Sequence, residues 1–202
     1  MNKVEPHMLK RVCVFCGAQP GLDPAHAALA AATGRAIASR GLGLVYGGGK
    51  VGLMGIVADA ALEAGGEVIG VIPEALMDRE LGHGGCTELR VVPSMHVRKQ
   101  TMLDLSDGFI VLPGGIGTLE ESVEVQSWAQ LGIHGKGLCY LDPGDGTWDP
   151  FFALLERMVQ GGFVRPHHAG LALRATSPEA ALDLLAGWTP PAVTRWMDRS
   201  GT

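Results

Sequence analysis

The sequence predicts an α/β protein with a Rossmann-like, doubly wound and mostly parallel sheet of about six to seven strands and helices on both faces. Short, continuously apolar segments recur along the chain, and such segments are typical of strands that are buried on both faces of a parallel sheet. Longer segments with helix-start and helix-stop residues lie between them. This alternation favours parallel β-α-β units.

The apolar segments and their boundaries place the individual elements. Strands are predicted at 11–17, 42–48, 67–73, 87–93, 108–114 and 136–142, with a short seventh at 169–176. Helices are predicted at 23–40, 52–65, 96–106, 118–131, 149–162 and 177–188. Asp149 and Ser177 are expected helix caps, because each precedes a proline. Ligands of such sheets bind beyond the carboxyl ends of the strands, so we expect the site in the loops after strands one, two, four and five.

Composition sets the class of protein. The 202 residues are 47% hydrophobic and 18% charged, which indicates one globular domain with a core at about 11–187 and a peripheral tail at 188–202. A net charge of −5 argues against a nucleic-acid partner. No segment is apolar over the length needed to span a membrane. Four cysteines in a chain of this length suggest a reduced, cytoplasmic setting.

The cysteines and histidines do not predict a metal site. Cys13 and Cys16 form a C-x-x-C pair within a predicted strand, where residues three apart point to opposite faces. A redox pair belongs at a helix start, and zinc would need a second pair. We therefore interpret both residues as core cysteines, and we expect neither a metal nor a cofactor.

A glycine-rich turn follows the second predicted strand. Gly47, Gly49 and Gly52 fit the G-x-G-x-x-G pattern, but no acid ends the next strand to hold a ribose, as a dinucleotide site requires. Lys50 is followed by Val51, which excludes a Walker A loop. Backbone N–H groups at such a turn can still contact an anion. A ligand-facing role and simple turn geometry both remain open.

Three basic residues, His96, Arg98 and Lys99, cluster at the expected start of a helix. The helix dipole disfavours cations there. Their placement makes sense if a carboxylate or a phosphate lies opposite, with arginine supplying a forked donor. The alternative is a solvated basic turn.

The sequence "FIVLPGGIGTLEE" runs from a buried strand through glycines into a helix. Thr118 and Glu121 have the spacing of a capping box, with Thr118 as N-cap and Glu121 at the third helical position. That role does not explain the proline and three glycines before them. Few side chains there would leave backbone N–H groups exposed at a helix N-terminus, which suits a phosphate. We therefore predict a phosphate site, with Glu121 beside it.

The segment "PGGIGTLEE" resembles the PGGxGTxxE motif of the LONELY GUY-type cytokinin riboside 5'-monophosphate phosphoribohydrolases. The segments "VYGGGKVGLMG", "IPEALMDREL", "MHVRKQTM" and "EVQSWAQLGIHGKG" are similar to that family in the same order, over about 11–165. The resemblance implies a homodimeric enzyme that cleaves the N-glycosidic bond of a nucleoside 5'-monophosphate, giving free base and ribose 5-phosphate. Arg98 and Glu121 match the family's catalytic pair. Its phosphate-binding element corresponds to Gly114, Gly115, Gly117 and Thr118.

Further substrate contacts are expected around these groups. The residues are Glu80 and Lys99, with Gly48, Gly49, Met95, Ile116, Leu119, Glu120 and Ser127. The chain departs from the family pattern at Ala18 and Gln19, where serines are usual, and at Ser127, where plant members usually have threonine. The first departure affects ligand contacts, and neither affects the catalytic pair.

The chemistry follows from the two candidate catalytic residues. Loss of a purine builds positive charge on the sugar, which the Glu121 carboxylate can stabilise, or that carboxylate can take a proton from attacking water. Arg98 stays charged and is a poor proton donor. Direct water attack and a transient glycosyl-enzyme both remain open.

Two other functions could use a phosphate site of this kind. A non-catalytic nucleotide carrier could use the same phosphate site, but it would not need both Arg98 and Glu121. A lysine decarboxylase would need a pyridoxal phosphate lysine and more protein than about 200 residues provide.

Overall fold

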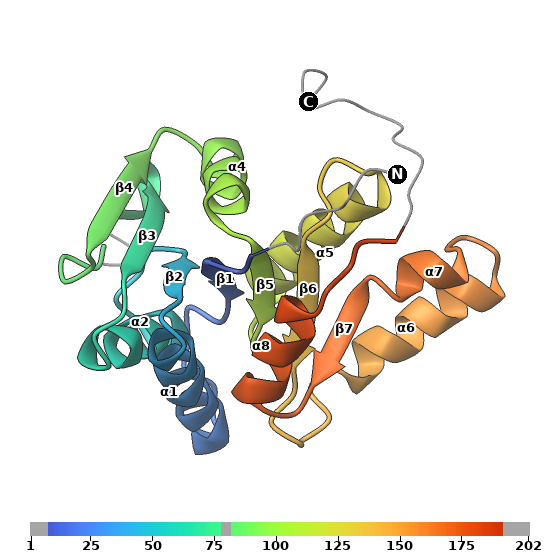
Figure 1. The fold of residues 1–202 in the computed structure, drawn as a ribbon, viewed down its shortest axis with the longest axis horizontal. Coiled ribbons are helices and arrows are strands. Elements are labelled where there is room, and N and C mark those ends of the chain that lie inside the picture. Colours follow the sequence, from blue (N-terminus) through green and yellow to red (C-terminus); the bar gives the residue numbers. More distant parts are fainter. Residues whose placement is uncertain (1–7, 78–81, 192–202) are drawn as a thin grey trace.

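Seven parallel strands form a single sheet in the computed structural model, which describes residues 8–77 and 82–191 (Figure 1). The strand order is β4-β3-β2-β1-β5-β6-β7, and every neighbouring pair is parallel. The strands are β1 (Arg11–Phe15), β2 (Gly43–Tyr46), β3 (Val68–Pro73), β4 (Glu88–Val92), β5 (Gly108–Val111), β6 (Gly137–Leu141) and β7 (Ala172–Ala175). The predicted fold class and all seven strands are confirmed.

Helices cover both faces of the sheet (Figure 1). One core holds residues of α1 (Pro24–Ser39), α2 (Gly52–Glu63) and α8 (Pro178–Ala186). The other holds residues of α4 (Met95–Leu105), α5 (Ile116–Gln130) and α6 (Asp149–Gln160). Side chains of β1 alternate between the two, with Val12 and Val14 in the first core and Cys13 and Phe15 in the second. Alternation along a strand thus buries both faces of the sheet.

The predicted helices are present, and within residues 8–77 and 82–191 two short ones were not predicted: the 3₁₀ turn η1 (Glu74–Leu76) and α7 (Pro166–Ala169). Ser177 caps α8 as expected, accepting a hydrogen bond from the Ala180 N–H at 3.2 Å. The prediction for Asp149 was wrong, because Trp148 holds the N-cap position and Asp149 is the first helical residue. The Asp149 carboxylate pairs instead with Arg174.

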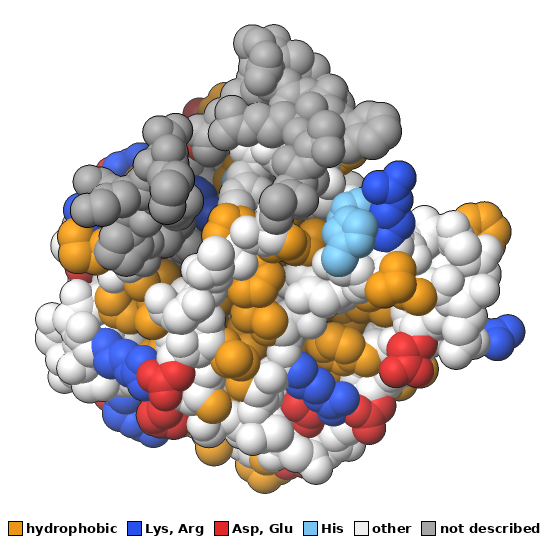
Figure 2. All heavy atoms as spheres, turned by 45° about the vertical axis from the view of Figure 1, so that its right-hand side comes forward, with side chains coloured by type: hydrophobic (Ala, Val, Ile, Leu, Met, Phe, Trp, Pro, Cys, Tyr) orange, Lys and Arg blue, Asp and Glu red, His pale blue; other side chains and the backbone are white. Residues whose placement is uncertain are grey.

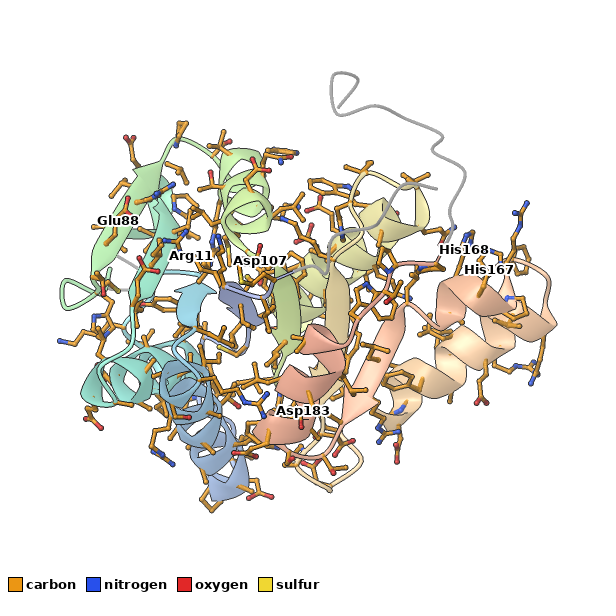
Figure 3. All side chains as sticks on the ribbon, viewed as in Figure 1. Arg11, Glu88, Asp107, His167, His168 and Asp183 are labelled. Atoms are coloured by element: carbon orange, nitrogen blue, oxygen red, sulfur yellow. The ribbon has the colours of Figure 1, made fainter. Side chains whose placement is uncertain are left out.

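The order in which strands are added to the sheet changes direction at β1, which lies between β2 and β5. The opposite, amino edge of the sheet is held by polar contacts around Arg11 and Asp107 (Figure 3). Arg11 pairs with Glu67 at 2.8 Å, and the Asp107 carboxylate accepts a hydrogen bond from the Arg11 N–H at 2.9 Å. The carboxyl edge at the β1–β5 switch is where a ligand site is expected in this topology.

The surface view and the cysteines describe the charge and the thiol chemistry of the molecule. On the face shown in Figure 2, Lys and Arg side chains are interspersed with Asp and Glu rather than gathered into a basic stripe. None of the helices within 8–77 and 82–191 is long and apolar enough to cross a bilayer. The four cysteines are free, and burial raises the pKa of the Cys13 and Cys16 thiols, so these two behave as small apolar core residues.

Candidate active site

A cavity of about 590 Å³ opens at the carboxyl edge of the sheet. Its walls come from the loop after β1, the first turns of α1 and α2, η1, α4, the β5–α5 loop with the first turns of α5, and the β6–α6 loop. Arg98 and Glu121 both line it. The cavity lies at the predicted edge of the sheet, although residues 47–51 of the loop after β2 do not line it and η1 and the β6–α6 loop do.

Arg98 is the fourth residue of α4, a helix whose N-cap Ser94 accepts a hydrogen bond from the Val97 N–H at 3.3 Å. Only 5% of the Arg98 residue is exposed. Its Nε donates to the Val71 carbonyl at 3.1 Å, and its Nη2 donates to the Gly47 carbonyl at 3.1 Å. Two backbone acceptors, one within β3 and one directly after β2, thus fix the plane of the guanidinium.

Gly47 makes room for this arrangement. A Cβ atom at Gly47 would lie 2.1 Å from Arg98 Nη2, far inside van der Waals contact. The glycine-rich turn after β2 therefore has a definite structural role, because it leaves room for the Arg98 guanidinium. Gly52 has a second such role, since its φ is +62° and a Cβ there would lie 2.3 Å from the Ala18 carbonyl carbon. This turn packs against the Arg98 side chain at Gly47 and against the backbone of the β1 loop at Gly52.

Glu121 faces Arg98 across the cavity. The distance from Arg98 Nη1 to Glu121 Oε1 is 3.7 Å, and the two side chains are 6% and 11% exposed. A buried cation is stable only with compensating charge or hydrogen bonds, and here the Glu121 carboxylate and two carbonyls supply them. The basic residue at the helix start is therefore matched by a carboxylate, and the solvated-turn alternative is wrong for Arg98.

The predicted capping box does not form. Helix α5 begins at Ile116 with Gly115 as N-cap, and the Leu119 N–H already donates to the Gly115 carbonyl at 3.1 Å. Glycine can take the N-cap position without a side chain, so the helix begins three residues earlier than a Thr118 cap would place it. Glu121 consequently lies in the second turn. Its carboxylate lines the cavity opposite Arg98.

The start of α5 has the features of an anion site. No side chain of the described residues caps it, so its first N–H groups lie at the positive end of the helix without a capping acceptor. The Gly17 N–H donates to the Pro113 carbonyl at 3.1 Å, which joins the β1 loop to the β5 loop. A Cβ at Gly114 would lie 2.2 Å from Thr118 Oγ1 and 2.9 Å from the Gly17 nitrogen. Close backbone approach requires glycine here.

Lys99 bridges α4 and α5 rather than lining the cavity. Its Nζ lies 2.6 Å from a Glu120 oxygen and 2.9 Å from a Glu124 oxygen. Burial lowers the pKa of Lys99, but the hydrogen bonds to these two carboxylates outweigh it and leave the pKa raised. Lys99 thus fixes the spacing of the helices that carry Arg98 and Glu121.

The other predicted contact residues divide into three groups. Those that line the cavity are Met95, Gly114, Gly115, Gly117, Thr118 and Glu120. Those that the structure describes outside the cavity lining are the buried Gly48 and Gly49, with Ile116, Leu119 and Ser127 on α5. Glu80 and the tail beyond 191 lie outside the described residues.

Two polar residues of the cavity wall were not predicted. His26, in the first turn of α1, and Thr147, in the β6–α6 loop, both line it. His26 Nε2 lies 2.9 Å from Asp145 Oδ2. The sequence pointed to the loop after the first strand, but no motif marks a lone histidine nine residues beyond it. Among the described residues, no group of three or more His, Cys, Asp or Glu could hold a metal ion.

These features define an α/β protein of the doubly wound class, with a buried Arg–Glu pair beside an uncapped helix start at its switch point. Solved structures share the fold. One is the molybdenum cofactor binding protein from the phototrophic bacterium Rippkaea orientalis, with a TM-score of 0.66 over 88% of this chain and 95% of that chain, at 22% identity. At that identity the similarity supports the fold alone.

Sequence relatives are closer. A cytokinin riboside 5'-monophosphate phosphoribohydrolase of Rhodococcoides fascians is 49% identical over 158 residues, covering 78% of this chain and 79% of the relative. A probable enzyme of that name from Oryza sativa subsp. japonica is 43% identical over 181 residues, covering 90% and 74%. The family profile described as "possible lysine decarboxylase" matches residues 54–185. The chain belongs to the LONELY GUY family of cytokinin riboside 5'-monophosphate phosphoribohydrolases.

Proposed function

We propose that this protein is a hydrolase that cleaves the N-glycosidic bond of a purine nucleoside 5'-monophosphate, either AMP or a cytokinin nucleotide, to free base and ribose 5-phosphate. The observation that carries the proposal is the Arg98–Glu121 pair, 3.7 Å apart, in the same cavity as the uncapped start of α5. The names of its relatives support the same reaction.

The roles follow from charge and position. The phosphate binds the backbone N–H groups at the start of α5, where the helix dipole and the uncapped donors favour an anion. This contact holds the sugar beside Glu121, whose carboxylate stabilises the developing oxocarbenium ion or accepts a proton from water. Arg98 remains charged and stabilises the negative charge that develops on the departing base.

A nucleoside without the phosphate should be a poor substrate. The phosphate is remote from the bond that breaks, so its binding energy holds the sugar in the reactive position. Adenosine offers the same base and sugar to Arg98 and Glu121. It has no phosphate for the backbone N–H groups at the start of α5, which we call the α5 cradle. We expect kcat/KM for adenosine to be at least about 100-fold below that for AMP, a difference of about 2.7 kcal/mol.

The protein is further proposed to act as a cytoplasmic homodimer. Apolar side chains are exposed on the two helices that carry the catalytic pair: Val97 is 41% exposed on α4, and Ile116 and Val123 are 82% and 42% exposed on α5. A second copy seated on this face would remove them from water. The four free cysteines suit a reducing compartment. Light scattering after gel filtration measures the mass, and a monomer would reject the dimer.

The direct test uses purified protein with AMP and with isopentenyl-adenosine monophosphate. Free base and ribose 5-phosphate are followed separately by chromatography, and adenosine serves as the matched control. The proposal expects stoichiometric release of both products from the monophosphates. A nucleotide that binds and is recovered intact after long incubation would instead identify a carrier.

The lysine-decarboxylase description receives no support from the cavity. Its described lining contains no lysine, and Lys99 is held by Glu120 and Glu124 outside it. A pyridoxal phosphate enzyme needs a lysine that can form a Schiff base with the cofactor. Absence of an aldimine absorption band after incubation with pyridoxal phosphate would agree with hydrolysis.

A further inference from the structure

His26 lines the same cavity as the start of α5. The cavity extends over several strands: Arg98 is anchored to the carbonyl groups of Gly47 and Val71, at the β2 and β3 side. Thr147 comes from the loop after β6, on the other side of β5. His26 is tied to that second side through Asp145. It therefore lies on the side of the cavity that is away from the anchors of the catalytic arginine.

The β1 loop connects His26 with the cradle. The loop starts at Gly17, whose N–H donates to Pro113 and whose nitrogen lies close to Gly114. It ends at Gly21, where a Cβ would lie 2.8 Å from His26 Nδ1. Both glycines and His26 line the cavity. The β1 loop thus joins the imidazole to the uncapped start of α5 along one wall of the cavity.

Asp145 fixes the orientation of the imidazole. Its carboxylate accepts hydrogen bonds from the backbone N–H and the hydroxyl of Thr147, at 2.9 and 2.6 Å, in addition to the contact with His26 Nε2. The hydrogen bonds from Thr147 and His26 lower the pKa of Asp145 to about 2. An ionised carboxylate accepts only, so Nε2 carries a proton. In the described part of the chain, His26 Nδ1 makes no hydrogen bond.

We propose that His26, oriented by Asp145, is a ligand for the phosphate of the substrate, with its imidazolium Nδ1–H donating to a phosphate oxygen. The inference rests on the proposed function for the identity of the ligand. It also offers a basis for the first departure from the family pattern: Ala18 and Gln19 replace hydroxyl groups beside the cradle, and a positioned imidazole restores a polar donor in the same cavity.

The charged groups around His26 mean that the charge of its ring affects the affinity of the cavity for an anion. The carboxylate of Asp145 faces the ring at 2.9 Å, and Asp23, the N-cap of α1, lies three residues away along the chain. Three further charged groups line the cavity: Arg98, Glu120 and Glu121. An imidazolium adds one positive charge at the anion end, and a neutral imidazole loses the second N–H. Anion affinity should therefore fall as His26 deprotonates.

Two variants separate a ligand from a purely structural contact. His26→Gln keeps a donor near the Nε2 position and can retain the hydrogen bond to Asp145, but it has nothing at Nδ1. His26→Asn places a donor near the Nδ1 position and gives up the contact with Asp145. We expect His26→Gln to keep the melting temperature and to lose about tenfold in affinity for AMP, as for a charge-assisted hydrogen bond. His26→Asn should lose less affinity and more thermal stability.

The measurement is calorimetric titration with sulfate, whose charge is constant over the range used, and with adenosine, at several values between about pH 5.5 and pH 8. Wild-type affinity for sulfate should fall as pH rises, His26→Gln should show a flat profile, and adenosine should respond to neither change. Equal sulfate profiles for wild type and His26→Gln would overturn the proposal. A parallel loss of sulfate and adenosine affinity in His26→Gln would also overturn it, by showing a structural contact only. Because sulfate binding needs no turnover, a protein that fails to hydrolyse AMP rejects the proposed function without affecting this test.

Discussion

Arg98 Nη1 and Glu121 Oε1 lie 3.7 Å apart, and neither side chain is more than 11% exposed. The two residues come from helices after different strands, α4 after β4 and α5 after β5. Backbone acceptors at Val71 and Gly47 fix the arginine independently of the glutamate. The pair is thus a pre-formed arrangement in which the carboxylate can interact with a reacting sugar while the cation stays in place.

The close contact between Gly47 and the Arg98 guanidinium predicts the effect of Gly47→Ala. The added methyl would lie 2.1 Å from Nη2, so the guanidinium must move or the turn must deform. We expect kcat for AMP to fall at least about tenfold and unfolding free energy to fall by about 1–3 kcal/mol, as in other overpacked sites. Steady-state kinetics and urea denaturation measure the two effects.

Gly84→Ala is the matched control for that variant. A Cβ at Gly84 meets no heavy atom within 4 Å, so the same chemical change should leave both activity and stability within about 0.5 kcal/mol of wild type. If Gly47→Ala behaves like Gly84→Ala, the proposed role of Gly47 in accommodating Arg98 is wrong.

The cradle predicts opposite effects of Gly117→Ala on stability and on binding. Gly117 lies in the first turn of α5 and lines the cavity, and a Cβ there meets no heavy atom within 4 Å. Alanine is up to about 1 kcal/mol better than glycine in a helix, so the melting temperature should rise. The methyl group should obstruct phosphate and raise KM for AMP about tenfold. A stabilised variant with unchanged KM would place the phosphate elsewhere.

The ion pairs of Lys99 predict a pH dependence of stability. Its folded-state pKa is raised, so the stabilisation is present below the unfolded pKa of about 10.4 and is lost as pH rises through the folded value. Glu120 is 51% exposed, which limits the contribution to about 0.5–1 kcal/mol. Urea denaturation at about pH 8 and pH 11 measures how much unfolding free energy each protein loses between the two values. The loss should be smaller for Lys99→Met than for wild type. The exposed Lys50→Met should leave the wild-type difference intact.

Much of the fold could be predicted from the sequence because buried parallel strands have a direct signature. Continuous apolar segments such as 108–112 mark strands covered on both faces, and Ser177 followed by proline marks a helix start. The start of α5 was misplaced for a physical reason. Thr118 and Glu121 have capping-box spacing, but Gly115 serves as N-cap without any side-chain signal.

The site was only partly predictable. The glycines and the Arg98–Glu121 pair are visible as local motifs, and the topology brings their loops together. Tertiary packing decides the ion pairs of Lys99 with Glu120 and Glu124. It also decides the contact between His26 and Asp145, which are 119 residues apart. No local pattern distinguishes these side chains from surface residues. The burial of Arg98, likewise, follows from Gly47 and Val71, which are distant in sequence.

Base release by Glu121→Gln tests the central claim most directly. Glu121 does not cap α5, and the glutamine amide oxygen can still accept a hydrogen bond from Arg98, whose two carbonyl partners remain. The variant should therefore stay folded and bind AMP, although it loses stability with the charge opposite Arg98. Glu124→Gln is the control, because Glu124 lies on the same helix and pairs with Lys99 outside the cavity. The account predicts that Glu121→Gln releases base from AMP or isopentenyl-adenosine monophosphate at least about 100-fold more slowly than wild type, with Glu124→Gln within about twofold of wild type. A folded Glu121→Gln protein with wild-type base release would contradict it.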